Sequence, residues 1–490
     1  MRKTVAVIGG GFAGLSSACS LASKGFDVTL LEKNETTGGR GRAFTSNGYS
    51  FDMGPSWYWM PGVFEEFFAS FGKKVSDYYE LKRLDPSYRV FFDGSHIDVP
   101  AEFEAFKKMI EELEPGSGPR LEKFLLEAKA KYDASMSEFI WKPSHSITEF
   151  LSPKLIRESL RLQLFSSFSA HAKKYFSHPK ILKLLEFPVL FLGAKPEKTP
   201  AMYSMMNYAD IMLGTWYPLG GMVKIAEAMT SLAKELGVKI ITSANVDKIE
   251  VDAKSAHSLL VNNEVMNVDA VIAAADYHYV ENSLLEPAQR SYSDAYWESR
   301  TMSPSSLIFY VGIDKKVSGL EHHNLFFDKD FEQHAHTIYT DESWPENPLF
   351  YVCCPSKSDS GVAPEGKENL FILIPVATGL SSTENDRKKY FVQCLKRILK
   401  HTGEDLTNRV EYFRSYAHEE FTSDYNSFKG NAYGLANTLM QTAIFKPKMR
   451  SKKVKNLFYA GQLTVPGPGV PPSIISGRIA ANEVESYLTR

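Results

Sequence analysis

The chain has 490 residues, 43% of them hydrophobic, so it can bury large apolar cores, and its length indicates roughly two to four domains. Its 56 Lys and Arg residues nearly balance its 58 Asp and Glu residues, which leaves no global field to attract nucleic acid. The four cysteines show no ligand spacing with one another or with histidine. Neither a disulfide framework nor a metal site is therefore expected.

The first element is an apolar, β-branched strand that runs into a glycine turn and a helix. Gly9, Gly11 and Gly14 fit the pattern G-x-G-x-x-G. In this pattern the first glycine allows a tight turn, the second lets the backbone approach a pyrophosphate, and the third packs the helix against the strand. The helix, about 14–25, would point the positive end of its dipole at the phosphates. The stretch predicts a dinucleotide site.

A second strand, 26–31, ends at Glu32, which lies where an acceptor for ribose hydroxyls belongs. The glycine-rich loop 37–42 follows, and its N–H groups and Arg40 could wrap a pyrophosphate or a flavin ring. A solvated surface turn is the competing interpretation of this loop. Because the nucleotide motif begins almost at Met1, no signal peptide is expected ahead of it, and a cytoplasmic location follows as an expectation.

The region from about 62 to 198 has mainly helical periodicity, interrupted by a predicted hairpin over 89–99. Within it, 162–192 mixes many Leu, Phe and Ile side chains with lysines. Such a mixture can lie on a membrane surface, with the cations at the head groups, or it can form a buried helical core. Both interpretations stay open. No run reaches the ~18 uncharged apolar residues that a spanning helix needs.

Elements typical of a dinucleotide-binding domain resume after this insertion, and a strand-rich stretch, 304–425, separates them from the C-terminal section. The expected elements are helices over 222–236 and 386–401, strands over 238–241, 246–252, 269–275, 307–313, 350–354, 370–374 and 456–461, and a last helix from about Ser473.

The C-terminal stretch 456–471, Asn-Leu-Phe-Tyr-Ala-Gly-Gln-Leu-Thr-Val-Pro-Gly-Pro-Gly-Val-Pro, resembles the signature of bacterial-type phytoene desaturases and related carotenoid desaturases. Residues 203–221 and 428–447 are similar to two inner motifs of that family, and 9–42 is shared more widely with FAD-dependent amine oxidases. The resemblance covers nearly the whole chain. It looks closer to the hydroxycarotenoid 3,4-desaturases, which act on 1-hydroxylated acyclic ends, than to the phytoene enzymes.

The resemblance implies an α/β fold with α+β insertions, in which a Rossmann-type FAD-binding domain of the amine-oxidase kind is combined with a discontinuous substrate domain. The FAD-binding domain would comprise 1–75, 215–285 and 426–490. Residues 76–214 would form a mainly helical, membrane-facing substrate region, and 286–425 would form a sheet-containing substrate domain. The implied partners are an acyclic carotenoid and the lipid of a membrane to which the protein is peripherally bound.

The same resemblance implies how a non-covalent FAD is held. Its pyrophosphate would lie on the first helix, Glu32 would bind the adenosine ribose, and Val246 would lie by the adenine. The flavin ring would sit near 38–40 and the N-terminus of the last helix, whose dipole stabilises negative charge. The residues expected to bind FAD are Gly9, Gly11, Phe12, Ala13, Gly14, Glu32, Lys33, Gly39, Arg40, Gly54, Pro55, Val246, Gly461, Gly469, Val470 and Pro471.

The implied reaction is dehydrogenation: a hydride passes to the flavin, a proton leaves the neighbouring carbon, and oxygen or a quinone reoxidises the cofactor. Asp210 matches an acidic position of the family, and an acid in an apolar tunnel could carry the proton. A solvated or helix-paired carboxylate explains Asp210 equally well. Glu149 is a second candidate. Family members can carry an arginine three residues after such an acid, and here that residue is Ser152.

Other activities fit the same motifs. A phytoene desaturase or a redox-neutral carotenoid isomerase would use the same fold, whereas a flavin amine oxidase would need an aromatic cage near the flavin and no lipid-docking surface. A non-enzymatic FAD or carotenoid carrier is the remaining class. The histidines show no triad or metal spacing, and the following are expected as surface or packing residues: His171, His278, His322 and His323.

Overall fold

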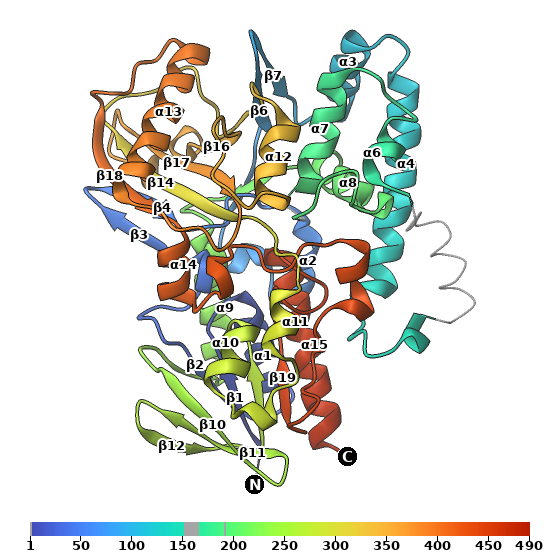
Figure 1. The fold of residues 1–490 in the computed structure, drawn as a ribbon, viewed down its shortest axis with the longest axis vertical. Coiled ribbons are helices and arrows are strands. Elements are labelled where there is room, and N and C mark those ends of the chain that lie inside the picture. The colour runs from blue at the N-terminus through green and yellow to red at the C-terminus, as the bar shows by residue number, and fades with distance from the viewer. Residues whose placement is uncertain (1, 151–165, 191–192) are drawn as a thin grey trace.

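The computed structural model describes residues 2–150, 166–190 and 193–490, and Figure 1 shows their arrangement. A five-stranded sheet with the order β19-β13-β1-β2-β9 lies in the lower half, and its pairings are all parallel. The strands are β1 (Thr4–Ile8), β2 (Asp27–Leu31), β9 (Lys239–Ile241), β13 (Ala270–Ala273) and β19 (Leu457–Tyr459), and the helices beside them are α1 (Phe12–Ser23), α9 (Val223–Glu235) and α15 (Val470–Leu488).

All strands of this parallel sheet come from the three segments predicted to form the FAD-binding domain, although the domain boundaries themselves stay a prediction. The predicted α/β fold with a Rossmann-type sheet is confirmed. Strand β1 is buried on both faces: Val5 and Val7 belong to the core that contains α1, α9 and α15, whereas Ala6 and Ile8 belong to a second core with residues 246–259 and 277–280. Both termini lie at the lower end of the molecule (Figure 1).

Helices α1 and α15 pack so closely that side chains of one helix contact the backbone of the other. The hydroxyl of Ser16 donates a hydrogen bond to the carbonyl of Ile474 (2.6 Å), and Ser17 donates to the carbonyl of Gly477 (3.0 Å). A Cβ atom at Gly477 would lie 2.3 Å from the carbonyl oxygen of Ala13 and would clash with it, so only glycine fits at this position. The first and last helices of the chain therefore form one layer against the sheet.

A seven-stranded sheet forms the upper left of the molecule in the order β18-β14-β17-β16-β15-β6-β7 (Figure 1). All its pairings are antiparallel except the one between β15 and β6. Its strands are β6 (Tyr88–Phe92), β7 (Ser95–Val99), β14 (Ser305–Ile313), β15 (His323–Phe326), β16 (Phe350–Cys353), β17 (Glu368–Val376) and β18 (Val410–Tyr416), with α12 (Phe331–Tyr339) and α13 (Glu384–Thr402) beside it.

The predicted hairpin over 89–99 is β6–β7, and it extends this sheet through the pairing of Asn324 with Arg89. The region 76–214, expected to be mainly helical, therefore also supplies strands to the strand-rich part of the chain. Smaller sheets complete the fold: β3 (Ala43–Ser46) with β4 (Tyr49–Asp52), β5 (Leu81–Arg83) with β8 (Trp216–Pro218), and β10 (Val246–Asp252), β11 (Ser255–Val261) and β12 (Glu264–Asn267).

Helices stand together at the upper right of Figure 1, beside β6 and β7. In the described part of 162–192, the side chains of Ile181, Leu184 and Phe187 are buried, which favours a helical core there; residues 162–165 and 191–192 lie outside the described residues. No helix among the described residues is long and apolar enough to cross a membrane. The helices of this group are α3 (Phe103–Leu113), α4 (Gly118–Ala134), α6 (Phe168–Ala172), α7 (Pro179–Leu190) and α8 (Met205–Ile211), whereas α2 (Pro61–Ala69) lies nearer the middle of the molecule, in contact with α15.

The last helix begins at Val470, earlier than the predicted Ser473. Gly469 precedes it with a φ of 113°, which favours glycine. Pro471 occupies the first turn, where no N–H group is needed for the helical hydrogen bonds. The remaining short helices are α10 (Tyr277–Ser283), α11 (Asp294–Glu298) and α14 (His418–Tyr425).

Candidate functional site

A cleft opens at the carboxyl ends of β1, β2 and β13, the usual place for a ligand in an open parallel sheet. Its walls combine parts of the chain that are far apart in sequence: the turn between β1 and α1, the loop 38–40, the start of β10, the residues 424–426, and the residues 460–464 after β19. Ser473, in the first turn of α15, also lines it. Both ends of the chain thus build one site.

The three glycines of the first motif have different surroundings. Gly9 has a φ of 102°, and a Cβ at Gly14 would lie 1.9 Å from the carbonyl oxygen of Gly9, so both positions are demanded by the fold itself. A Cβ at Gly11 would meet only the Cα of Gly39, at 3.8 Å. Gly11 also caps α1 without a side-chain hydrogen bond. The space beside it is open to the cleft, as a pyrophosphate on a helix N-terminus requires.

Glu32 is 4% exposed, and its carboxylate is held by the chain's own N–H groups. One oxygen, Oε2, accepts from the backbone N–H of Gly10 (2.7 Å), and Oε1 accepts from the backbone and side-chain nitrogens of Asn34 (2.9 and 2.8 Å). A carboxylate offers about four acceptor positions, so one on Oε2 is left for a ligand. That arrangement suits a ribose hydroxyl.

Arg40 carries a buried donor with no partner in the described residues. Its Nη2 donates to the hydroxyl of Ser427 (3.0 Å) and to the carbonyl of Asn431 (3.1 Å), and its guanidinium lies over the ring of Tyr425 (5.0 Å). The Nε–H group makes no hydrogen bond, and burial lowers the pKa of the guanidinium. A buried unsatisfied N–H group of this kind calls for an acceptor on a ligand. The oxygens of a flavin dinucleotide fit it.

The residues predicted to bind FAD, which stay predictions, differ in their position relative to the cleft. Those that line it are Gly9, Gly11, Phe12, Ala13, Glu32, Lys33, Gly39, Arg40, Val246 and Gly461. Those that do not line it are Gly14, Gly54, Pro55, Gly469, Val470 and Pro471. Gly14 serves helix packing, Gly54 lines a neighbouring pocket, and the last three residues begin α15 with Ser473 reaching the cleft in their place.

Sequence reasoning missed several residues of this cleft, among them Asp276 and Tyr425. Asp276 follows the buried strand β13, so its place at the carboxyl end of a parallel strand was a usable signal. Its buried carboxylate accepts from the backbone nitrogens of Tyr279 (3.2 Å) and Phe428 (3.3 Å), and burial raises its pKa. Tyr425 ends α14, which no local pattern connects to the nucleotide motif.

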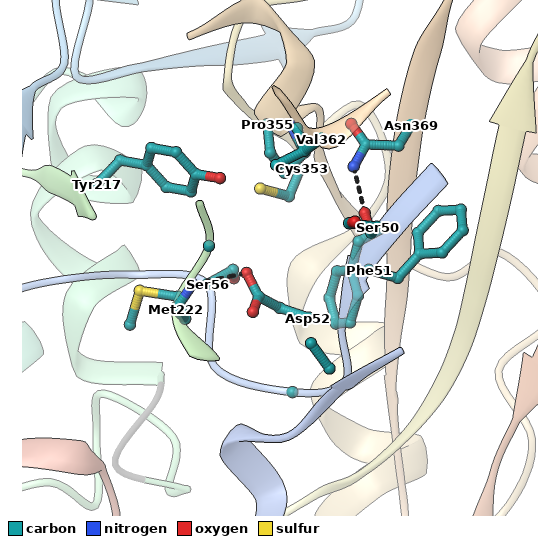
Figure 2. A pocket seen from close by; sticks show the side chains of 14 residues that line it. Ser50, Phe51, Asp52, Ser56, Tyr217, Met222, Cys353, Pro355, Val362 and Asn369 are labelled. Atoms are coloured by element: carbon teal, nitrogen blue, oxygen red, sulfur yellow. Dashed lines mark hydrogen bonds between the residues drawn. The ribbon is translucent and has the colours of Figure 1, made fainter. Parts of the chain in front are cut away.

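A second pocket is lined by residues of the segment 50–56, which follows the glycine-rich loop 37–42 in the chain. Figure 2 shows the carboxylate of Asp52, the hydroxyl of Tyr217 and the thiol of Cys353 around one space. Asp52 accepts hydrogen bonds from the backbone nitrogens of Met222 (2.8 Å) and Val223 (2.9 Å) at the start of α9, and burial raises its pKa to about 6. These bonds fix the end of β4 and so position the residues after it.

A cluster of aromatic rings is centred on Trp57, a few residues after the end of β4. The indole of Trp57 stacks on the imidazole of His323 (4.0 Å between centroids, 13°). It also contacts the rings of Trp59 (5.1 Å), Tyr88 (5.6 Å) and Phe187 (5.2 Å). We call these five residues the aromatic wall. They come from the segment after β4, from β6, from α7 and from β15, and they form one packed, largely buried aromatic cluster.

Asp210 is hydrogen-bonded to a residue of the aromatic wall, Tyr88. It lies in α8, 3% exposed, and its Oδ2 accepts from the hydroxyl of Tyr88 (2.9 Å). Its Oδ1 is reached by the hydroxyl of Thr215 (3.4 Å), which itself accepts from the indole N–H of Trp59 (2.9 Å). Burial raises the pKa of Asp210 to about 7, more than these donors lower it. The carboxyl is neither solvated nor paired with its own helix, and its catalytic role stays a prediction.

Glu149 has different surroundings. Its two carboxylate oxygens accept from the backbone nitrogens of Ser144 (3.0 Å) and Ser146 (2.9 Å), so it holds its own loop together. It lines neither of the two pockets described above. Ser152 lies outside the described residues. Glu149 as a catalytic residue remains a prediction.

His322 and His323 are buried, and with Cys353 they place possible ligand atoms within 4.8 Å of one another. Spacing along the chain does not reveal this group, because it arises when His323 pairs with Cys353 across β15 and β16. The Nδ1 atoms already pair with the hydroxyls of Ser358 (2.9 Å) and Tyr351 (2.6 Å). Burial lowers the pKa of His322 to about 3, so its ring stays neutral. Of the other two histidines, His171 is buried and His278 half-buried.

Comparison with known proteins gives consistent results. Residues 12–485 match the family described as flavin containing amine oxidoreductase. The chain is 41% identical to a carotenoid 3,4-desaturase of Haloarcula japonica over 98% of this chain and 97% of the relative, and 30% identical to a zeta-carotene-forming phytoene desaturase of Myxococcus xanthus over 99% and 94%. Cyclohexylamine oxidase of Brevibacterium oxydans shares the fold, with a TM-score of 0.61 at 15% identity and complete coverage of both chains.

These comparisons confirm three predictions: the resemblance, the fold class and the FAD cofactor. The chain is an FAD-dependent oxidoreductase. The open side of Gly11, the remaining acceptor position of Glu32 and the unpaired N–H of Arg40 all fit this cofactor.

Replacing Gly11 with valine should remove FAD without unfolding the protein. The chain itself leaves room for the new side chain, whereas the pyrophosphate does not. Purified Gly11→Val should be colourless, with a thermal midpoint equal to that of the wild-type apoprotein. Gly62→Val in α2, where nothing lies within 4 Å of an added Cβ, is the matched control and should stay yellow. A yellow Gly11→Val protein would refute this position for the pyrophosphate.

The raised pKa of Asp210 predicts a pH-dependent stability. In the folded protein Asp210 keeps its proton up to about pH 7, whereas in the unfolded chain it loses it near its ordinary pKa of 3.8. The free energy of unfolding therefore falls as pH rises through this window and is lowest above pH 7. Asp210→Asn removes the effect and should gain stability over wild type between pH 5 and pH 8, by up to about 4 kcal/mol.

Chemical denaturation at pH 5 and at pH 8 measures the difference in the free energy of unfolding between Asp210→Asn and wild type. Asp133→Asn, an exposed carboxylate on α4 paired with Lys129, is the control and should not change the pH dependence. If Asp210→Asn and wild type keep a constant difference from pH 5 to pH 8, Asp210 titrates normally and cannot be held as a neutral acid.

Proposed function

Because the chain belongs to the flavin containing amine oxidoreductase family and, within it, to the carotenoid desaturases, we propose that it is a carotenoid 3,4-desaturase acting on a 1-hydroxylated acyclic end. The observation that carries this proposal is the likeness, along nearly the full length of both chains, to a carotenoid 3,4-desaturase. The aromatic wall is the part of the chain that we propose packs against the polyene.

The protein's part in the reaction is to hold the substrate and exclude water. When bound, FAD supplies the acceptor for the hydride that dehydrogenation releases. The aromatic wall packs against the polyene and keeps water away from the reacting carbons. Residues 54–59 connect this wall, along the chain, to β4 and the glycine-rich loop 37–42. Arg40 holds the cofactor in place by an N–H group that has no partner among the described residues.

Asp210 is the proposed destination of the proton that leaves the neighbouring carbon. Its hydrogen bond from the hydroxyl of Tyr88 connects it to the aromatic wall, so when Asp210 is a carboxylate Tyr88 can accept the proton while passing its own to Asp210. A carboxyl with a pKa near 7 exchanges protons readily at neutral pH. Oxygen or a quinone is the proposed final electron acceptor.

A carotenoid is insoluble in water, so we also propose that the protein docks on a membrane surface. Met440 is 64% exposed and Phe445 is 47% exposed, on the segment that precedes Lys446. Large exposed apolar side chains close together on one segment suit insertion among lipid chains.

Turnover on a panel of carotenoids tests the proposed activity. FAD-loaded protein in liposomes should remove two hydrogens from 1-hydroxyneurosporene, seen as a mass loss and a longer-wavelength absorption spectrum. Conversion of phytoene alone would indicate a phytoene desaturase, and a shifted spectrum at constant mass would indicate an isomerase. Failure with every carotenoid, together with oxidation of a soluble amine, would contradict the proposal.

Liposome flotation tests the membrane surface. Wild-type protein should float with the vesicles, and the double variant Met440→Asp with Phe445→Asp should stay in solution, because a carboxylate cannot enter the acyl region without a large desolvation cost. Val265, 70% exposed on β12 at the lower end of the molecule, provides the matched control Val265→Asp, which should still float. Equal flotation of both variants would mean that another surface binds lipid.

A further inference from the structure

Two buried polar side chains near the flavin cleft have no use in the reaction described so far. Asn437 is 3% exposed and Lys446 is 2% exposed. Neither the Oδ1 of Asn437 nor the Nζ of Lys446 has a hydrogen-bond partner among the described residues. A buried acceptor or donor left unpaired is costly, and an unpaired ammonium is costlier still. Two such groups on one segment suggest that a ligand completes them.

The two groups lie at the same place, against Gly467. A Cβ built on Gly467 would be 3.2 Å from the Oδ1 of Asn437 and 3.3 Å from the Nζ of Lys446. Gly467 has a φ of 139°, so other residues are disfavoured there on backbone grounds as well. The donor and the acceptor are therefore neighbours beside a residue without a side chain.

This place lies where the helical region meets the flavin cleft. Gly467 is in the loop between Thr464 and Ser473, and both of those residues line the cleft. The segment that carries Lys446 continues to Lys448, whose Nζ donates to the carbonyl of Ser144 in the helical region (2.9 Å). The pair is therefore connected along the chain both to the cleft wall and to a contact with the helical region.

The chemistry of the pair selects the ligand group. A hydroxyl accepts a hydrogen bond through its oxygen and donates one through its hydrogen, so it can satisfy Lys446 and Asn437 together. A carboxylate or phosphate could accept from Lys446 and from the Nδ2 of Asn437, which lies 3.4 Å from the same Cβ position, but it would leave the Oδ1 of Asn437 unpaired; a hydrocarbon end would leave both unpaired groups without a partner. Burial lowers the pKa of Lys446 to about 7, which is compatible with a neutral ligand beside it.

We propose that Asn437 and Lys446 bind the terminal hydroxyl of the substrate and so determine its specificity. This inference rests on the proposed carotenoid desaturase function and names the part of the substrate that is recognised. In a 1-hydroxylated end the hydroxyl is on C1, and the new double bond joins C3 to C4. A hydroxyl site must therefore lie close to the flavin. Gly467 meets this condition, because it lies between two residues that line the cleft, Thr464 and Ser473.

The test compares 1-hydroxyneurosporene with neurosporene, which differ at the end group recognised. Wild type should prefer the hydroxylated compound in kcat/KM. Lys446→Met and Asn437→Leu should each reduce that preference by about 10- to 100-fold, mainly by raising KM for the hydroxylated compound, because one hydrogen bond to the hydroxyl is lost. Replacing an unpaired buried ammonium with an apolar group of similar shape should not impair folding.

Lys446→Arg, which keeps a donor, should recover more of the preference than Lys446→Met. Lys453→Met, an exposed lysine on the same stretch, is the matched control and should leave the preference unchanged. Equal loss on both carotenoids, or an altered flavin spectrum, would overturn the proposal and assign Lys446 to the flavin or the fold. Unchanged preference in both variants would overturn it while leaving the desaturase function standing. Inactive wild type on both carotenoids would overturn the two together.

Discussion

The contact between α1 and α15 is the constraint on which the rest of the molecule depends. Gly477 has no side chain to keep Ala13 away, and the hydroxyls of Ser16 and Ser17 donate across the same contact. The helix that begins the chain and the helix that ends it are thereby held in one layer, with their N-termini at the same cleft. Because both N-termini carry partial positive charge, the contact brings two positive helix ends to one cleft, which suits the anionic pyrophosphate that we propose binds there.

Around that contact, the polar groups that the fold leaves incomplete indicate the ligands. Where the chain satisfies its own buried groups, as with the carboxylate of Asp52 on the first turn of α9, the role is structural. Where a buried group keeps a free position, as with Arg40 and Lys446, a ligand group must supply the partner. We propose that the partner of Arg40 is the cofactor and that the partner of Lys446 is the substrate. Between them the aromatic wall supplies the apolar surface for a hydrocarbon.

The sequence predicted the parts of the site that local physics controls. Gly9 and Gly14 are demanded by backbone geometry, and Glu32 follows a buried strand, so each was recognisable from its neighbours. Pairing between distant segments was not visible in this way: β6 joins β15, and His323 meets Cys353, only because the sheet closes in that register. The C-terminal residues Gly469, Val470 and Pro471 stay predictions, and the residue of the first turn of α15 that lines the cleft is Ser473.

An anaerobic single turnover tests the central claim most directly, namely that one site built from both chain ends passes electrons from a carotenoid to FAD. FAD-loaded protein in liposomes is mixed with 1-hydroxyneurosporene without oxygen or quinone, and the flavin and polyene spectra are followed together. The account predicts that the flavin bleaches in step with formation of one new double bond per cofactor. A polyene that changes while the flavin stays oxidised, or a flavin that never bleaches, would contradict it.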